Sequence, residues 1–495
     1  MSTLAKGIAF LSGGTILSFL LSFLAAPITS RLFPPEAFGL AALFASFGTI
    51  FGPIAGLRYD KAILLPKEDR DASQLFVLSL LWMAIITVLL FFGVYQWGPA
   101  ILLKLGASAL IPVLWWIPVS VALFALALPI QAWLTRGENY RVLAEQRIWK
   151  QGGASAFAIT GGATGYQSGM HLAGFRLLGQ IFGPLRMIHF MIRRSHMLPG
   201  GITVTGIFQQ MKRYWKFPAF SVSDSLLEAT GREAPVILLA FFFDPAIVGY
   251  FSRAAMLVGV PFAVLGMALE QVFYQQTSSL HANGQSIKEL TERLYRSVIR
   301  YTFLPFALLC LLGPELFQFF LGSPWREAGV FAALLAPFIF FKLVVIPLGT
   351  LYNVLERQGV GLTFNLALFL VQIGALVAGG VMGNSRTALM IYTFGSIVVL
   401  TLLGAWSLRA ANVPLLRSFW LLLKTSIVSG LFLVPAGMAK VVLNLSFGWV
   451  LLVATISVVV YFALHITHDP ETMNLLDRIR SQLGSKWSDS MGDHD

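Results

Sequence analysis

Long apolar stretches, separated by short charged or turn-rich breaks, run through the 495 residues of the chain. An apolar run of roughly 20 residues is what an α-helix needs to cross the hydrocarbon core of a bilayer. We therefore predict an all-α, polytopic membrane protein with about fourteen transmembrane helices. Their predicted extents are 7–30, 37–65, 72–97, 111–134, 142–166, 168–192, 215–243, 246–276, 297–321, 328–354, 359–383, 387–410, 416–440 and 446–467.

A pattern of prolines and glycines occurs twice, with its two copies about 210 residues apart. The first copy contains the segments 35–39 (PEAFG) and 53–57 (PIAGL), and the second contains 245–249 (PAIVG) and 261–265 (PFAVL). Two similarly built halves in a membrane are typical of transporters whose site lies between the halves. We interpret the pattern as a duplication of a six-helix unit, followed by two additional C-terminal helices.

The composition supports a membrane protein: 57% of the residues are hydrophobic and 12% are charged, against about 25% charged in soluble proteins. The net charge of +12 does not indicate nucleic-acid binding, because the basic residues are scattered over short loops. Basic residues instead follow the even-numbered spans, among them Arg147 and Lys150 after the fourth, which predicts both termini in the cytoplasm. The predicted divisions are an N-terminal bundle at 1–212, a C-terminal bundle at 213–412, two helices at 413–468 and a cytoplasmic tail at 469–495.

Ionisable side chains inside the predicted spans are the candidate functional residues, because each costs at least about 2.5–3.5 kcal/mol at the bilayer centre unless it faces water or a partner. In the seventh span, Ser225, Glu228 and Arg232 recur at helical spacing, and Asp224 borders them. Glu228 and Arg232 are also placed to form a structural ion pair. Asp224 and Glu228 are the candidates for coupling to H⁺ or Na⁺.

Cationic residues are distributed over several other spans. They are Arg58, Arg176, Arg186, Arg253 and Lys342, and with Arg232 they form the candidate substrate-binding set. Arg58 and Arg186 have the alternative of extending to the cytoplasmic surface. A cavity lined by these groups would favour an anion, and the planar guanidinium group suits phosphate oxygens.

Patterns that would indicate an enzyme or a metal centre are missing from the sequence. There is no phosphate-binding glycine loop of the GxxxxGK[ST] type, and the predicted extracytoplasmic loops are too short for a catalytic domain. His465 and His468 are one turn apart without a third ligand nearby, so we predict no metal site. We predict no catalytic residues and no cofactor.

Two segments resemble bacterial polysaccharide repeat-unit flippases (Wzx-type) of the multidrug/oligosaccharidyl-lipid/polysaccharide exporter superfamily. The segment 56–66 (GLRYDKAILLP) resembles the end of the second helix of this family, and 321–329 (LGSPWREAG) resembles its connection between helices 9 and 10. The segments 133–136 (WLTR) and 145–147 (EQR) also fit the family. Asp60 stands where glutamate is more usual, and Ser323-Pro324 is an unusual insertion.

The resemblance implies two six-helix bundles around a central cavity in the bacterial inner membrane. It implies transport of polyprenyl-diphosphate-linked oligosaccharide repeat units for lipopolysaccharide or exopolysaccharide synthesis, with Arg58 and Arg253 as candidate diphosphate ligands. The partners would be the lipid-linked oligosaccharide, membrane lipids and the polysaccharide polymerase and chain-length machinery, and no nucleic acid. The alternatives are a cation-coupled multidrug exporter of the same superfamily, or a membrane glycan polymerase or ligase.

Overall fold

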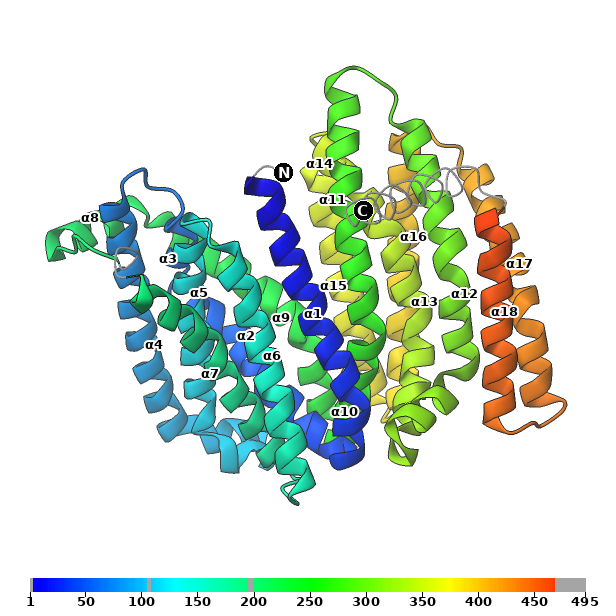
Figure 1. Cartoon of the computed structure of the whole chain (residues 1–495), viewed down its shortest axis with the longest axis horizontal. Coiled ribbons are helices and arrows are strands. Elements are labelled where there is room, and N and C mark those ends of the chain that lie inside the picture. The colour runs from blue at the N-terminus through cyan, green and yellow to red at the C-terminus, as the bar shows by residue number, and fades with distance from the viewer. Residues whose placement is uncertain (1–2, 105–107, 195–198, 468–495) are drawn as a thin grey trace, which may run out of the picture. The chain divides into compact units, whose positions relative to one another are not determined.

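The computed structural model describes residues 3–104, 108–194 and 199–467, and within these ranges the protein consists of helices without a β-strand (Figure 1). This confirms the predicted all-α, polytopic fold. The predicted cytoplasmic tail lies outside the described residues.

The first half of the chain contains α1 (Thr3–Leu32), α2 (Pro35–Ala55), α3 (Tyr59–Ala62), α4 (Asp69–Lys104), α5 (Trp116–Arg136), α6 (Tyr140–Ala163), α7 (Gly169–Arg193), α8 (Val204–Arg213), α9 (Val222–Phe242) and α10 (Pro245–Ala254). It continues with α11 (Val260–Ala282), α12 (Lys288–Leu321), α13 (Arg326–Gly349), α14 (Leu351–Val354), α15 (Gln358–Val381), α16 (Ser385–Ala410), α17 (Leu415–Val441) and α18 (Phe447–Thr467). Short 3₁₀ or π segments lie between some of them: η1 (Ser108–Val113), η3 (Phe217–Ser221), η4 (Ala255–Gly259) and η5 (Ser323–Trp325).

Ten helices of the described chain are long and apolar enough to cross a membrane, or eleven when the bent pair around η4 is taken as one span. Helices α6, α7 and α9 have 24, 25 and 21 residues, so each is at least about 31 Å long at 1.5 Å per residue. Each is long enough to span the bilayer, although none meets the apolarity test. Helices therefore lie at all fourteen predicted positions. That each of the fourteen crosses the membrane stays a prediction.

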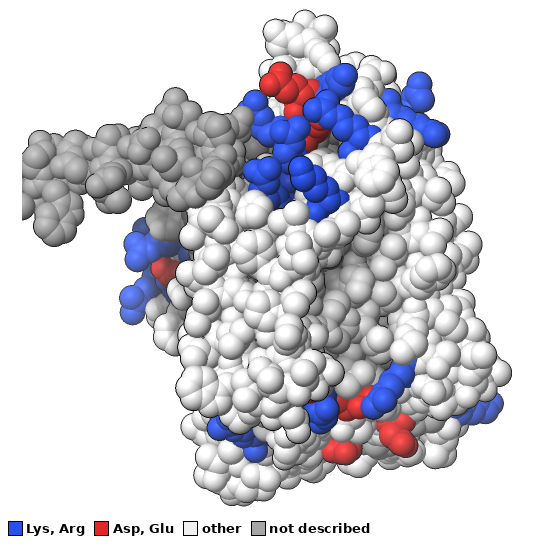
Figure 2. Space-filling view, turned by 90° about the vertical axis from the view of Figure 1, so that its right-hand side faces the viewer, with Lys and Arg blue, Asp and Glu red and all other residues white. Residues whose placement is uncertain are grey.

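The surface agrees with a membrane environment. On the face in Figure 2, most charged side chains gather near the upper and lower edges, a smaller group lies at the left rim, and the broad surface between them carries other residues. Large apolar side chains such as Leu24, Val88 and Phe394 are about two-thirds exposed or more. Contiguous apolar surface of this extent is rare on soluble proteins, so lipid is its expected partner.

The two copies of the proline–glycine pattern begin equivalent helices. Pro35 is in the first turn of α2 and Pro245 in the first turn of α10, where the missing proline N–H is not needed by the helix. The two helix starts pack against each other in a reciprocal way: Gly39 faces the backbone of Pro245, and Gly249 faces the backbone of Pro35. The duplicated motif thus forms a close contact between its own copies.

The chain divides into two compact units. The first comprises 1–268, 314–339 and 359–400, and the second comprises 269–313, 340–358 and 401–495. These units follow packing, and the predicted divisions at 212, 412 and 468 stay predictions. All the geometry around the candidate site below belongs to the first unit.

Two local features differ from what the sequence pattern suggests. The amphipathic segment 286–296 is not a separate surface helix: from Lys288 onward it is the beginning of α12, which continues without a break to Leu321. Its first turns are polar because they project beyond the apolar part of the same helix. The basic connection before α9 contains a helix that was not predicted, α8, whose Gly206 and Gln210 are buried.

Candidate functional site

Arg253 on α10 is only 4% exposed and ties α10 to α1. Its Nε donates to Ser30 Oγ at 3.0 Å, and its Nη2 donates to Thr29 Oγ1 at 2.7 Å and to the Ala26 carbonyl oxygen at 3.4 Å. Burial of a guanidinium group requires this kind of multiple hydrogen bonding, because each lost water contact must be replaced. Most donors of Arg253 are therefore occupied by the protein itself.

Aromatic rings complete the surroundings of Arg253. Its guanidinium carbon lies 3.9 Å from the centre of the Phe38 ring and 5.8 Å from that of Trp325. Trp325, fully buried, donates its indole N–H to the Ser30 carbonyl oxygen at 2.7 Å. The family-like segment 321–329 thus supplies a wall of this site, and cation–π attraction adds to its hydrogen bonds.

Arg176 on α7 approaches the same phenylalanine, with its guanidinium carbon 5.6 Å from the centre of the Phe38 ring. Arg176, Arg253 and Lys150 of α6 line one cavity of about 360 Å³, together with Ser22 and Gln180. The structure therefore brings two of the predicted cations together and adds a third. Within the described chain, the side chains of Arg176 and Lys150 make no hydrogen bond or ion pair, and Lys150 lies 5.6 Å above the Phe124 ring.

Electrostatics of this cavity favour an anion. No aspartate or glutamate is among its lining residues, so three formal positive charges meet without a compensating carboxylate. Like charges repel strongly in a low-dielectric interior, and a bound anion relieves that repulsion. Arg176 and Lys150, which have unused donors, are the cations best placed to bind it.

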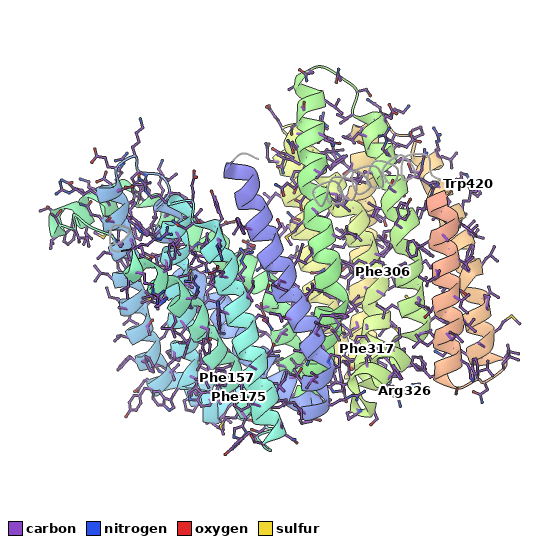
Figure 3. The ribbon with its side chains drawn as sticks, viewed as in Figure 1. Phe157, Phe175, Phe306, Phe317, Arg326 and Trp420 are labelled. Atoms are coloured by element: carbon purple, nitrogen blue, oxygen red, sulfur yellow. The ribbon has the colours of Figure 1, made fainter. Side chains whose placement is uncertain are left out.

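Lys150 lies elsewhere than the charge pattern predicts. The pattern places Lys150 among the cytoplasmic basic residues, but the residue lies ten residues, or about 15 Å, inside α6. The signal was present in the pattern Gln146, Arg147, Lys150 and Gln151, which repeats at i and i+4 and puts one polar face on α6. Phe157 of α6 packs against Phe182 of α7, and Phe175 of α7 packs against Phe33 and faces Gly161 of α6 (Figure 3).

Arg58 and Arg186 lie outside the lining of this cavity. Arg58 lies after α2, has a left-handed φ of 60°, and pairs with Asp60 at 3.7 Å. Arg186 of α7 pairs with Glu145 of α6, which also accepts a hydrogen bond from Arg141. Each of these two arginines thus has a carboxylate partner within its own region.

The polar residues of α9 are mostly exposed. Arg232 pairs with Glu228 at 2.6 Å, and both side chains are about two-thirds exposed. Asp224 is exposed on the same helix, whereas Ser225 is buried. Lys342 is exposed on α13 in the second unit, so it is described apart from the cationic cavity. No group of three His, Cys, Asp or Glu residues in the described chain could hold a metal ion.

A sequence model described as "Polysaccharide biosynthesis protein" matches residues 28–329, which is more than half of the chain. The chain belongs to the polysaccharide biosynthesis protein family. The match includes α2, α7 and α10 and ends in the segment 321–329, so it covers the elements around Arg176 and Arg253. The resemblance to repeat-unit flippases is confirmed at the level of the family. No curated protein matches the chain by sequence.

Solved structures share the fold of this family member. The chain is similar to a structure titled "Lipid II flippase MurJ, inward closed conformation", with a TM-score of 0.72 and 14% identity, covering 92% of this chain and 98% of that one. It is also similar to an inward-facing multidrug resistance MATE family transporter of the MOP superfamily, with a TM-score of 0.58 and 16% identity, covering 80% and 94%. These similarities show a multi-pass membrane fold shared with transporters.

Proposed function

We propose that this family member is a flippase that moves polyprenyl-diphosphate-linked oligosaccharide repeat units across the bacterial inner membrane, with both termini in the cytoplasm. One observation carries the proposal: Arg176, Lys150 and Arg253 line one cavity among helices of a membrane protein, and no carboxylate lines it. A diphosphate carries the charge that this cavity lacks, and its oxygens accept hydrogen bonds from guanidinium and ammonium donors.

Within this proposal, Arg176 and Lys150 bind the diphosphate, and Arg253 holds the wall of the cavity. The N–H groups of Arg253 donate to Ser30, Thr29 and the Ala26 carbonyl oxygen, so its main effect is to fix α1 against α10. Its positive charge still contributes to the potential in the cavity. Arg58, Arg186, Arg232 and Lys342, outside the lining, would act at other stages of transport or in folding.

The proposed mechanism is alternating access without covalent chemistry. The reciprocal contact between the starts of α2 and α10 is the closure that must open on one side. Moving two negative charges out of an inside-negative cell releases about 4–5 kcal/mol per 100 mV of membrane potential. The demanding step is then the return of the empty protein, for which Asp224 and Glu228 are candidates to couple to H⁺ or Na⁺.

The main alternative is a cation-coupled multidrug exporter, because a MATE transporter shares the fold. Cationic drugs require carboxylates or exposed aromatic faces in their cavity. The cavity here is lined by three cations and no carboxylate, which favours an anionic substrate. A glycan polymerase or ligase would need a carboxylate or a histidine as general base at the site, and the lining residues include no aspartate, glutamate or histidine.

The test is translocation by the full-length protein in liposomes, with a fluorescent undecaprenyl-diphosphate oligosaccharide in one leaflet. Arg176→Ala and Lys150→Ala should each slow translocation about tenfold or more, because each removes a charge-assisted hydrogen bond worth about 1.5–3 kcal/mol. Lys212→Ala is the matched control, since Lys212 is an exposed cation at the end of α8.

Normal translocation by both cavity variants, in folded protein, would refute the proposed diphosphate site. Equal loss in the Lys212→Ala control would indicate a general effect of surface charge. Efflux of a cationic dye by the wild type, without movement of the lipid-linked probe, would favour the drug-exporter alternative.

A further inference from the structure

A second cavity, of about 460 Å³, adjoins the cationic cavity within the first unit. It lies among α1, α5, α6 and α7. Both cavities are lined by Phe19, Ser22, Lys150, Gln151 and Gln180. A ligand that occupies one cavity and extends past Lys150 therefore enters the other.

The lining of the second cavity differs in chemistry from that of the first. Four glutamines face it from three helices: Gln131 of α5, Gln146 and Gln151 of α6, and Gln180 of α7. Hydroxyl groups of α1 add to them, from Thr15, Ser18 and Ser22. No aspartate or glutamate is among the lining residues, and the cations are Arg147 and Lys150.

Much of the hydrogen-bonding capacity of these glutamines is unused. The Oε1 of Gln180 accepts from Ser120 at 3.5 Å, which leaves its amide N–H donors available. The Nε2 of Gln151 donates to Ser155 at 3.4 Å, which leaves its carbonyl oxygen available. Within the described chain, the side chains of Gln131 and Gln146 make no hydrogen bond. Amide groups without partners inside a membrane protein are costly, and a polar ligand or water is needed to offset that cost.

The hydroxyl groups of α1 can serve a ligand mainly as acceptors, because their own protons are already donated within the helix. Thr15, Ser18 and Ser22 donate to carbonyl oxygens of their own helix at 2.8–3.1 Å. Their oxygen lone pairs are then directed to other donors, and Arg147 uses the one on Thr15. The lining thus offers donors from amide N–H groups and acceptors from amide and hydroxyl oxygens, beside the rings of Phe19 and Phe124.

We propose that this second cavity binds the sugar that is bonded directly to the diphosphate, a hexose or an N-acetylhexosamine. A sugar ring presents hydroxyl groups that both donate and accept hydrogen bonds, and an amide side chain can accept from such a group and donate to it. The volume is within the range of about 300–1,000 Å³ that is usual for small-molecule sites. Because the first sugar is covalently attached to the diphosphate, its subsite must adjoin the cationic cavity, and Lys150 and Gln180 line both.

This inference rests on the proposed function and adds a subsite to it. The alternative explanation of the glutamines is structural: they only hold water in the groove between α1 and α6. The two explanations differ in one measurable property: a sugar subsite makes Gln131 and Gln146, which line only the second cavity, matter for glycosylated ligands and not for the bare lipid diphosphate.

The experiment measures binding of two probes to the full-length protein in nanodiscs. One probe is undecaprenyl diphosphate, and the other is undecaprenyl diphosphate bearing one hexose or N-acetylhexosamine, taken as a panel of glucose, galactose and their N-acetylamino forms. The variants are Gln131→Leu and Gln146→Leu, at two glutamines that line only the second cavity, and each keeps the side-chain size and removes the amide. Gln372→Leu is the matched control, because Gln372 on α15 is outside both cavities and donates to Ser396.

We expect at least one glycosylated probe to bind tighter than the bare diphosphate to the wild type. Gln131→Leu and Gln146→Leu should weaken binding of that probe about tenfold or more, since sugar hydroxyls that lose their hydrogen-bond partner in a binding site are strongly penalised. The affinity for the bare diphosphate should change less than about twofold. The tenfold loss expected for the glycosylated probe corresponds to about 1.4 kcal/mol.

Several results would overturn the sugar subsite while leaving the diphosphate site in place. These are equal wild-type affinity for the bare lipid and every glycosylated probe, unchanged binding in both variants, or equal loss for both kinds of probe. Failure of the wild type to bind any probe would instead remove the proposed function, and the sugar subsite with it.

Discussion

Gly249 on α10 packs so closely against α2 that adding a single methyl group tests the whole contact. In Gly249→Ala, the new Cβ would lie 2.7 Å from the Pro35 carbonyl carbon and closer still to its oxygen. Ordinary van der Waals contact begins at 3.4 Å, so relieving the contact with the carbon alone takes about 0.7 Å, and the closer oxygen requires a larger separation of the two helix starts. Backbone atoms cannot move aside as a flexible side chain would.

Overpacking of this kind costs about 1–3 kcal/mol, while alanine in a helix gains up to about 1 kcal/mol over glycine. If the contact must open during transport, a bias of 1–3 kcal/mol changes the ratio of closed to open protein by about 5- to 150-fold. We therefore expect Gly249→Ala to melt several degrees below the wild type and to favour the open arrangement.

The assay combines thermal unfolding with labelling of a buried cysteine. Ala37→Cys in the first turn of α2 is introduced with Cys310→Ser, so that a maleimide reports only on position 37, which is 2% exposed. Labelling should be faster in Gly249→Ala than in its parent. Gly374→Ala is the matched control, because a Cβ at Gly374 on α15 meets no atom within 4 Å.

A Gly249→Ala protein that melts at or above the wild type, and labels at the parent rate, would refute the reasoning about this contact. A lower melting temperature with an unchanged labelling rate would show that the contact affects stability alone, and would remove it from the proposed opening motion.

The other predictions concern residues outside the two cavities. Arg136 donates to Asp69 and to the carbonyl oxygens of Pro66 and Lys67 at 2.6–3.1 Å, so Arg136→Ala should lower the free energy of unfolding by about 2–3 kcal/mol in thermal melts without changing the affinity for undecaprenyl diphosphate. A large change in that affinity would show that this residue does more than hold the connection. If the exposed pair of Glu228 with Arg232 faces water, Glu228→Gln should change stability by less than about 0.5 kcal/mol, and a clearly larger change would place the pair against lipid. If Asp224 and Glu228 couple transport to an ion, Asp224→Asn or Glu228→Gln should abolish the response of liposome transport to an imposed pH or Na⁺ gradient, and an unchanged response in both would exclude them.

Fold class followed from the sequence because the bilayer imposes a simple length and polarity rule on helices. The apolar runs predicted a helix at each of fourteen positions. The rule did not place Lys150, because the polar face of α6 made the first turns of this helix resemble a cytoplasmic end. At 286–296 an amphipathic pattern, which is also typical of a separate surface helix, continues directly into the apolar part of α12.

The candidate site was only partly predictable. Arg176 and Arg253 were recognisable as charges within spans, because a buried cation needs a reason. Their convergence on the Phe38 ring depends on how α7 and α10 pack against α2, which no local pattern encodes. The hydrogen bonds from Arg253 to α1 could not be predicted either, since Ser30 and Thr29 are more than 220 residues away along the chain.

By itself, the sequence determined which segments are helical and apolar and where the duplicated proline–glycine motif stands, because these depend on neighbouring residues. Only the tertiary structure decided that the two motif copies meet, that Lys150 faces the same cavity as Arg176, and that four glutamines gather beside them. Those facts depend on contacts between distant helices, and side-chain packing in three dimensions sets them.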